Sequence, residues 1–141
     1  MKIFVAIDGS KNSLRGLKVA IKLAGKLSEP SHLILANAHD DIALRGASQF
    51  VGKQAVDRYL DDLAETELKS AIEQARKSGV TFESRVLRGR VAQTIAESAD
   101  DSKCDLIVLG SKGRSALKDL MIGSVAQRVT SLAKTPVLLV K

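Results

Sequence analysis

The sequence is poor in cysteine and in aromatic residues, and each shortage excludes a class of protein. Cys104 is the only cysteine among 141 residues, so no disulfide can form within the chain. The only histidines are His32 and His39, so a metal site of clustered Cys and His ligands is not expected. Aromatic residues make up 3% of the chain, too few for a surface that stacks single-stranded nucleic acid. We therefore expect Cys104 to pack rather than to react.

Long hydrophobic segments are also missing. No apolar run approaches the roughly 20 residues that a membrane-spanning helix needs. The run Ile3–Ile7 is too short for the core of a signal peptide and is followed at once by Asp8. Apolar residues form 45% and charged residues 27% of the chain, which is ordinary for one globular domain. We expect a cytoplasmic protein with one domain over residues 1–141 and no membrane partner.

The net charge of +6 is concentrated on one predicted helix. Its basic residues recur every three or four positions and are Lys11, Arg15, Lys18, Lys22 and Lys26. Apolar residues recur on the opposite side of the same segment, which is the usual pattern of a helix with one solvated face. We therefore interpret the basic stripe as a solvated face and expect no nucleic-acid partner.

Apolar runs alternate with amphipathic segments along the whole chain. The predicted strands are Lys2–Ile7, His32–Ala38, Val80–Leu87, Asp105–Leu109 and Pro136–Val140. The predicted helices are Lys11–Leu27, Val51–Ser78, Val91–Ala99 and Ser124–Ala133. The expected inward face of the longest helix is Val56, Tyr59, Leu60, Leu63, Leu68, Ala71, Ile72 and Ala75. This alternation predicts a single α/β domain, with a Rossmann-like, doubly wound parallel sheet of order 3-2-1-4-5 and helices on both faces.

Glycines follow two of the predicted strands at the point where such sheets bind ligands. In the order 3-2-1-4-5, the loops after the first and fourth strands diverge and open a crevice at their carboxyl ends. The first loop contains Asp8-Gly9-Ser10, and the second contains Gly110 and Gly113. Further on, Gly123-Ser124 opens the last predicted helix. Glycine permits close approach to an anion and a helix start offers free N–H groups, so these residues predict a phosphate cradle.

Two common nucleotide motifs are absent. No two glycines are separated by one residue, so the fingerprint of dinucleotide-binding sheets is missing. No glycine pair has the spacing of a P-loop followed by Lys and Ser or Thr. A Rossmann dehydrogenase and a P-loop NTPase are therefore disfavoured.

The spacing G-x2-G-x9-G-S resembles the ATP-binding branch of the universal stress protein family. The resemblance covers the whole chain and includes Ile3–Ser10, Cys104–Arg114, Ser124-Val125 and Thr135–Val140. It implies a regulatory or stress-response protein that acts through occupancy by ATP, ADP or AMP, with at most slow hydrolysis. Mg²⁺ would accompany a triphosphate, because the phosphate charge needs neutralising. The family also implies a homodimer through the apolar edge strand Val137–Val140.

The resemblance also implies roles for individual residues. Ala6, Ile7 and Asp8 would line the nucleoside side of the pocket, with the Asp8 carboxylate near the ribose hydroxyls. Ala38 would meet the adenine edge through its backbone. The residues expected around the ribose and phosphates are Leu109, Gly110, Gly113, Gly123, Ser124 and Val125. Lys112 and Arg114 either add charge to this cradle or are solvated loop residues.

Some of these residues have alternative structural roles. Asp8 could cap the first helix or interact with its dipole, and Ser124 could cap its own helix. Asn37-Ala38 departs from the family, which often has His and a bulkier aliphatic residue there, so the apolar clamp on a base is weaker. Arg88-Gly89-Arg90 follows the edge strand and is interpreted as a turn with solvated arginines. No catalytic residue or metal ligand is assigned.

Two other functions remain open. An ATP pyrophosphatase or adenylating enzyme uses a related sheet but needs a Gly- and Ser-rich loop after the first strand. Asp8-Gly9-Ser10-Lys11 supplies only a fragment of such a loop. The other alternative is an interaction module without a nucleotide.

Overall fold

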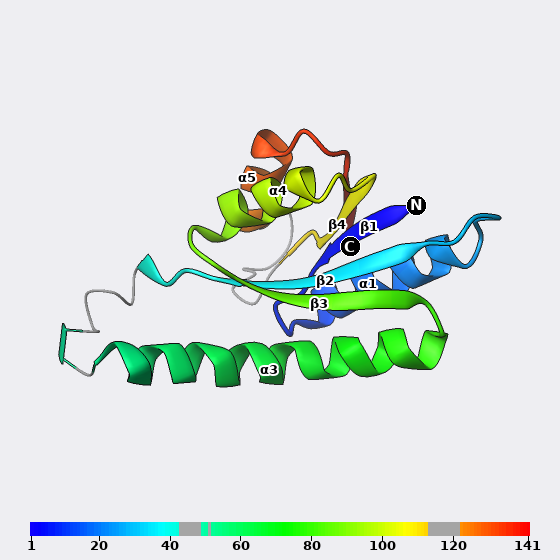
Figure 1. Cartoon of the computed structure of the whole chain (residues 1–141). Coiled ribbons are helices and arrows are strands. Elements are labelled where there is room, and N and C mark those ends of the chain that lie inside the picture. Colours follow the sequence, from blue (N-terminus) through cyan, green and yellow to red (C-terminus); the bar gives the residue numbers. More distant parts are fainter. Residues whose placement is uncertain (43–48, 51, 113–121) are drawn as a thin grey trace.

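A five-stranded parallel sheet forms the centre of the computed structural model, which describes residues 1–42, 49–50, 52–112 and 122–141 (Figure 1). The strands are β1 (Lys2–Ala6), β2 (His32–His39), β3 (Thr81–Arg88), β4 (Leu106–Gly110) and β5 (Val137–Val140). The helices discussed below are α1 (Lys11–Ala24), α3 (Lys53–Ser78), α4 (Val91–Asp101) and α5 (Ser124–Leu132). The strand order β3-β2-β1-β4-β5 and the parallel pairing confirm the predicted doubly wound sheet.

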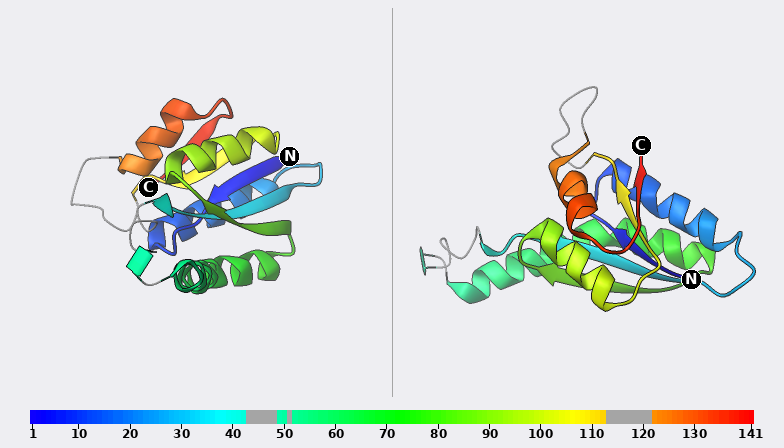
Figure 2. Two further views of the ribbon diagram at one scale, coloured as in Figure 1. Left: turned by 60° about the vertical axis from the view of Figure 1, so that its left-hand side comes forward. Right: turned by 90° about the horizontal axis from the view of Figure 1, so that it is seen from above.

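Helices cover both faces of the sheet. Figure 2 shows α1 and α3 on one side and α4 and α5 on the other. The alternation of β1 side chains explains this arrangement, because Ile3 and Val5 pack with α1 and α3 while Phe4 packs with α4 and α5. All three side chains are fully buried. The central strand is therefore apolar on both faces, and polar groups can gather only beyond its end.

The structure corrects part of the predicted inward face of α3. Tyr59 was expected in the core but is 59% exposed. The buried residues of the helix are Leu60, Ala64, Glu67, Leu68, Ala71 and Ala75. Tyr59 lies about 100° around the helix from Leu60, and the first turns of α3 extend past the sheet (Figure 1).

Arg88 is also not the solvated turn residue that the sequence predicted. Its guanidinium contacts Asp57 at 2.6 Å and Asp61 at 2.5 Å, both on the first turns of α3. The hydrogen bond with Asp61, helped by Asp57, raises the pKa of Arg88 above its ordinary value. By contrast, Arg90 is exposed and begins α4 as its N-cap. Arg88 thus ties the end of β3 to the start of α3.

Cys104 lies where a packing residue is expected. It is 8% exposed and belongs to the core cluster between the sheet and α4 and α5. Burial raises the pKa of its thiol, which disfavours the reactive thiolate. Across the described ranges, none of the helices has the length and apolarity required to span a membrane.

Candidate functional site

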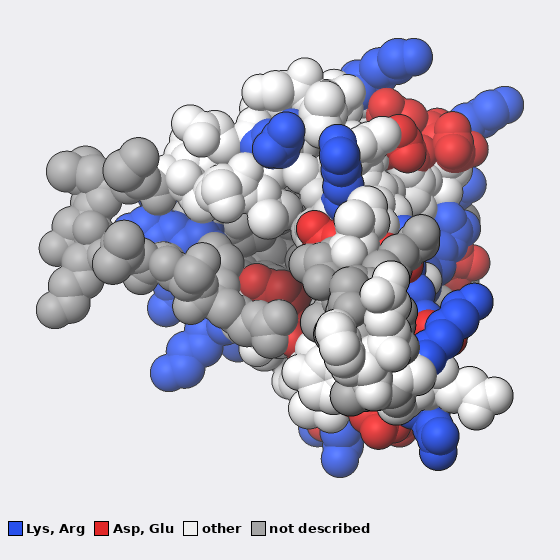
Figure 3. All heavy atoms as spheres, turned by 90° about the vertical axis from the view of Figure 1, so that its left-hand side faces the viewer, with Lys and Arg blue, Asp and Glu red and all other residues white. Residues whose placement is uncertain are grey.

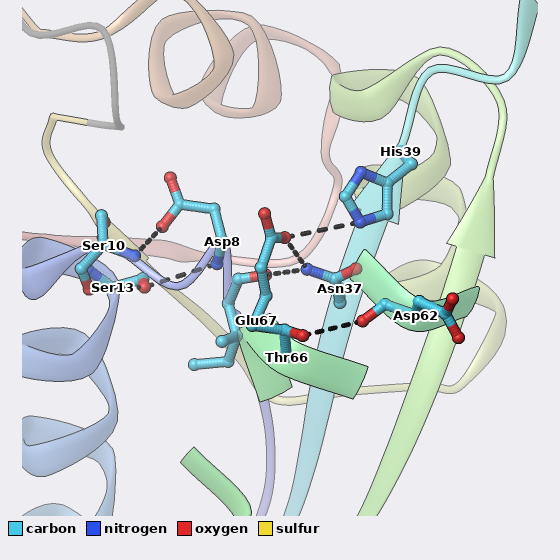
Figure 4. A network of polar contacts seen from close by, with 9 residues as sticks. Asp8, Ser10, Ser13, Asn37, His39, Asp62, Thr66 and Glu67 are labelled. Atoms are coloured by element: carbon cyan, nitrogen blue, oxygen red, sulfur yellow. Dashed lines mark hydrogen bonds and ion pairs between the residues drawn. The ribbon is translucent and has the colours of Figure 1, made fainter. Parts of the chain in front are cut away.

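The loop that follows β1, here called the β1 loop (Asp8–Ser10), turns directly into α1. Ser10 is the N-cap of α1, and its hydroxyl accepts a hydrogen bond from the Ser13 amide at 3.1 Å. The Ser10 amide donates in turn to Oδ1 of Asp8 at 3.0 Å. The other Asp8 oxygen points away from this amide (Figure 4). The helix cap is therefore Ser10, so the alternative role of Asp8 as the cap is wrong.

Gly110, at the end of β4, lies against the first turn of α1. A Cβ atom at this position would lie 2.8 Å from the carbonyl carbon of Asn12 and 3.0 Å from the Ser13 nitrogen. Real Cβ atoms essentially never come so close to backbone, so only glycine fits here. Helix packing thus explains Gly110 without a ligand, and its contact with phosphate stays a prediction. The same contact brings the end of β4 and the start of α1 together.

The start of α5 is held at the same edge of the sheet. The Gly123 amide donates to the Ser111 carbonyl at 2.8 Å, and the Ser111 amide donates to the Val140 carbonyl at 2.7 Å. Gly123 is the N-cap of α5 with φ −60° and ψ 148°, and a glycine has no side chain with which to cap the helix. Ser124 is the first helical residue, so the alternative role of Ser124 as the cap is wrong. The first amides of α5 lack intrahelical partners and lie beside the ends of β4 and β5.

The predicted nucleoside residues lie at the ends of β1 and β2. Ala6 ends β1, and Ala38 packs toward α4 and α5. The Ile7 side chain is 2% exposed. The Ile7 amide donates to Ala36 at 2.8 Å and its carbonyl accepts from Asn37 at 2.8 Å. Ile7 therefore fixes the strand end more than it offers polar groups to a ligand.

The predicted phosphate residues are only partly described. Leu109 is 4% exposed and packs in the core, so only its backbone can face the crevice. Val125, on the first turn of α5, is 40% exposed. Lys112 is partly exposed, whereas Gly113 and Arg114 lie outside the described residues. The structure thus brings Asp8, Gly110, Gly123 and the first turns of α1 and α5 to one edge of the sheet.

A buried polar cluster beside the β1 loop was not predicted. Asn37 and His39 on β2 face Glu67 on α3, and all three side chains are buried (Figure 4). Nδ2 of Asn37 donates to Oε2 of Glu67 at 2.7 Å, and Nε2 of His39 lies 3.4 Å from the same oxygen. The helical spacing of Glu67 from Ala64 and Ala71 was the available signal, because it places Glu67 on the inward stripe.

The edge that carries the site has an uneven charge distribution. Figure 3 faces this end of the molecule and shows acidic side chains near its middle, with lysines and arginines mostly around the rim. In the parts of the chain that the structure describes, no three His, Cys, Asp or Glu residues form a metal-binding group.

Known proteins resemble this chain over its full length. The model for the universal stress protein family matches residues 1–141. The universal stress protein MJ0531 of Methanocaldococcus jannaschii is 34% identical, over 99% of this chain and 81% of its own length.

Solved structures show the same architecture. That of MJ0577, from the same organism, has a TM-score of 0.86 at 24% identity, over 99% of this chain and 94% of its own. A universal stress protein in complex with cAMP has a TM-score of 0.68 at 28% identity, over 100% of this chain and 97% of its own. With its fold, its strand order and a family match from end to end, the chain belongs to the universal stress protein family.

Proposed function

We propose that this protein binds an adenine nucleotide at the carboxyl ends of β1 and β4. The phosphates would lie at the start of α5, the ribose near Asp8, and the base near the end of β2 at Ala38. Occupancy of this site, rather than turnover, would be the regulatory signal.

The observation that carries the proposal is the convergence of two helix starts and a carboxylate at one edge. The first turn of α1 lies so close to Gly110 that a Cβ atom there would clash with it, and Gly123 is hydrogen-bonded to the loop after β4. The amides at the start of α5 point away from their own helix and attract anions through the helix dipole. The carboxylate of Asp8 can accept hydrogen bonds from both hydroxyls of a ribose.

The cAMP complex supports the choice of an adenine nucleotide. That protein is 28% identical to this chain and matches its whole length. Its ligand combines a ribose, a phosphate and an adenine, which are the groups that the carboxylate, the helix start and the end of β2 would each receive. Ala38 offers little apolar surface to the base, so we propose that the phosphate and ribose contribute most of the affinity.

Hydrolysis is proposed to be slow at most. Phosphoryl transfer needs metal ligands and a positioned nucleophile in addition to a cradle. If ATP binds, Mg²⁺ would be held mainly by the phosphates, and Asp8 would supply the one carboxylate of the β1 loop. Such a site favours retention of the nucleotide over its conversion.

Thermal unfolding with and without nucleotide tests the proposal. A ligand at 100 times its Kd stabilises the folded state by about 2.7 kcal/mol, which is an easily measured shift in melting temperature. We expect a shift with millimolar ATP and Mg²⁺, and adenine nucleotides in the small molecules that denatured, freshly purified protein releases. Absence of both would contradict the proposal. Release of pyrophosphate from ATP would favour an adenylating enzyme instead.

We also propose that two copies pair through β5. This strand lies at the edge of the sheet, and its four residues Val137–Val140 are apolar and only partly buried. An exposed edge of this kind has free backbone groups and an apolar surface that a second copy can cover. Light scattering at micromolar concentration should give twice the monomer mass, and a monomeric mass would contradict the pairing.

A further inference from the structure

Glu67 is a buried carboxylate with no role in the nucleotide site proposed above. It lies on the inward stripe of α3 and is 6% exposed, with Leu68 and Ala64 buried beside it. Burying a carboxylate is unfavourable unless partners stabilise it. A leucine at this position would pack in the same stripe without that penalty. The contacts of Glu67 should therefore explain why a polar side chain is present.

The polar end of Glu67 is connected to the end of β1 through Asn37. Nδ2 of Asn37 donates to Oε2 of Glu67 at 2.7 Å and to the Ile7 carbonyl at 2.8 Å. Both acceptors require the nitrogen of the amide group, so the orientation of the Asn37 side chain is determined. The Ile7 carbonyl immediately precedes Asp8. Glu67 thus holds, through one intervening side chain, the residue from which the β1 loop departs (Figure 4).

The aliphatic part of Glu67 contacts the same loop directly. A Cβ atom placed on Gly9 would lie 3.1 Å from Cγ of Glu67 and 3.4 Å from its Cβ. Gly9 has φ +75°, a conformation that glycine adopts readily and other residues rarely do. The stem of Glu67 therefore packs against the turn of the loop, while its carboxylate holds the strand that leads into it.

We propose that Glu67 is a positioning residue that fixes the β1 loop (Asp8–Ser10), and with it the Asp8 carboxylate, from the α3 side of the sheet. This inference rests on the proposed function for its consequence on affinity, but the effect on the loop is independent of any ligand. Nε2 of His39, which is also buried, lies 3.4 Å from the same oxygen of Glu67.

Three variants separate positioning from general stability. Glu67→Ala removes both the stem and the carboxylate, so the loop loses its support. Glu67→Gln keeps the stem and an oxygen acceptor for Asn37, and should rescue the loop. Ile72→Ala is the matched control, because it removes partly buried apolar atoms that pack against the core cluster on the same helix, more than one turn further along α3 than Glu67.

Amide hydrogen exchange in the ligand-free protein is the first measurement. The reporters are the Ser10 amide, which is bonded to Asp8, and the Ile7 amide, which is bonded to Ala36. We expect both to exchange at least tenfold faster in Glu67→Ala, and within threefold of wild type in Glu67→Gln and Ile72→Ala. Unchanged exchange in Glu67→Ala would overturn the proposal, as would equal acceleration in Ile72→Ala.

Nucleotide affinity is the second measurement. The dissociation constant for ATP with Mg²⁺ should rise at least tenfold in Glu67→Ala and less than threefold in the other two variants. If wild-type protein binds no nucleotide while the exchange pattern holds, the proposed function fails and the positioning role stands. If wild type binds and Glu67→Ala binds equally well, the positioning role fails and the proposed function stands.

Discussion

The starts of α1 and α5 lie at the same edge of the sheet but differ in how their first amides are capped. At α1, the Ser10 hydroxyl accepts from the Ser13 amide, so a side chain satisfies one of the exposed donors. At α5, the N-cap is Gly123, which has no side chain to accept from the first amides. A cap and an anion compete for the same donors. Under the proposed function, this difference makes the start of α5 the place for a phosphate and α1 the helix that supports the site.

The two helices are also fixed at different points. Near α1, the β1 loop is held by Asp8, Ser10 and Ser13 through hydrogen bonds close to the helix start. Beyond the end of α5, Asp100 of α4 accepts from the Lys134 amide and from both the amide and hydroxyl of Thr135. Side-chain hydrogen bonds therefore stabilise the start of α1 and the segment that follows α5. Under the proposed function, the first amides of α5 donate to the ligand.

The largest effect is expected from a side chain added at the open helix start. Gly123→Val places a branched side chain beside the first amides of α5, and we expect ATP affinity to fall about 100-fold, or about 2.7 kcal/mol. Gly123 has φ −60° and ψ 148°, which valine adopts readily, so the fold should persist. Calorimetric titration measures the affinity.

A matched valine tests whether that loss is local. Gly25, at the end of α1, has φ −73°, and a Cβ there makes an ordinary contact of 3.6 Å with Ile21. Gly25→Val should bind ATP like the wild type. Equal losses in both variants would show that valine acts through the fold and not through the helix start.

Ser124→Ala should lower affinity without lowering stability. The hydroxyl caps nothing in α5, so its removal should change the free energy of unfolding by less than about 0.5 kcal/mol. A hydrogen bond to a charged phosphate is worth about 1.5–3 kcal/mol, so affinity should fall about tenfold or more. Chemical denaturation and titration of one preparation give both values. A stable variant with wild-type affinity would remove Ser124 from the site.

Ser10→Ala should show the opposite behaviour. Loss of an N-cap hydroxyl costs about 1 kcal/mol, so the variant should unfold at lower denaturant concentration. Its affinity should stay within about threefold of wild type, because the Ser10 amide that contacts Asp8 is retained. If Ser10→Ala and Ser124→Ala change the same quantity, the contrast between the two helix starts is wrong.

The last prediction concerns the anchor that follows α5, where no effect on the nucleotide site is expected. The Thr135 hydroxyl, with the Lys134 and Thr135 amides, lowers the pKa of Asp100 below its ordinary value. A lowered folded-state pKa stabilises the protein above the unfolded-state pKa, and this stability is lost as the pH falls through the folded-state pKa. Asp100→Asn should cost about 1 kcal/mol at pH 7.

The pH profile provides the check on this prediction. The difference in melting temperature between wild type and Asp100→Asn should be constant from pH 7 to about pH 5 and should shrink below about pH 4. ATP affinity at pH 7 should be unchanged, because Asp100 lies beyond the far end of α5 from Gly123. If the difference in melting temperature between wild type and Asp100→Asn grew as the pH fell, the stabilising role of the Asp100 carboxylate would be contradicted.

The sheet could be predicted because its signals are local. Short apolar runs alternate with amphipathic segments, and right-handed crossovers leave few orders for such a chain. That order also predicted that the loops after β1 and β4 lie side by side at the carboxyl ends of their strands. Helix ends were less certain, since α1 ends at Ala24 although the apolar pattern continues to Leu27. Residues beyond Gly25 no longer gain burial against the sheet.

The missing parts depend on contacts between distant segments. The requirement for glycine at 110 comes from the backbone of Asn12, almost a hundred positions earlier. Glu67 follows the inward spacing of α3, but its partner Asn37 lies on another element and only the fold joins them. Arg88 precedes a glycine and was therefore interpreted as part of a turn, but its acidic partners are on α3, far from it in the sequence. The partners of such residues cannot be predicted from the sequence, because only the folded chain brings them together.

The ion pairs of Arg88 have a practical consequence for engineering the chain. Because Asp57 and Asp61 contact Arg88 at the end of β3, the beginning of α3 is anchored by the strand that follows it in the chain. A peptide grafted between Ile42 and Gly52 should leave the register of α3 intact, and Glu67 would remain beneath Gly9.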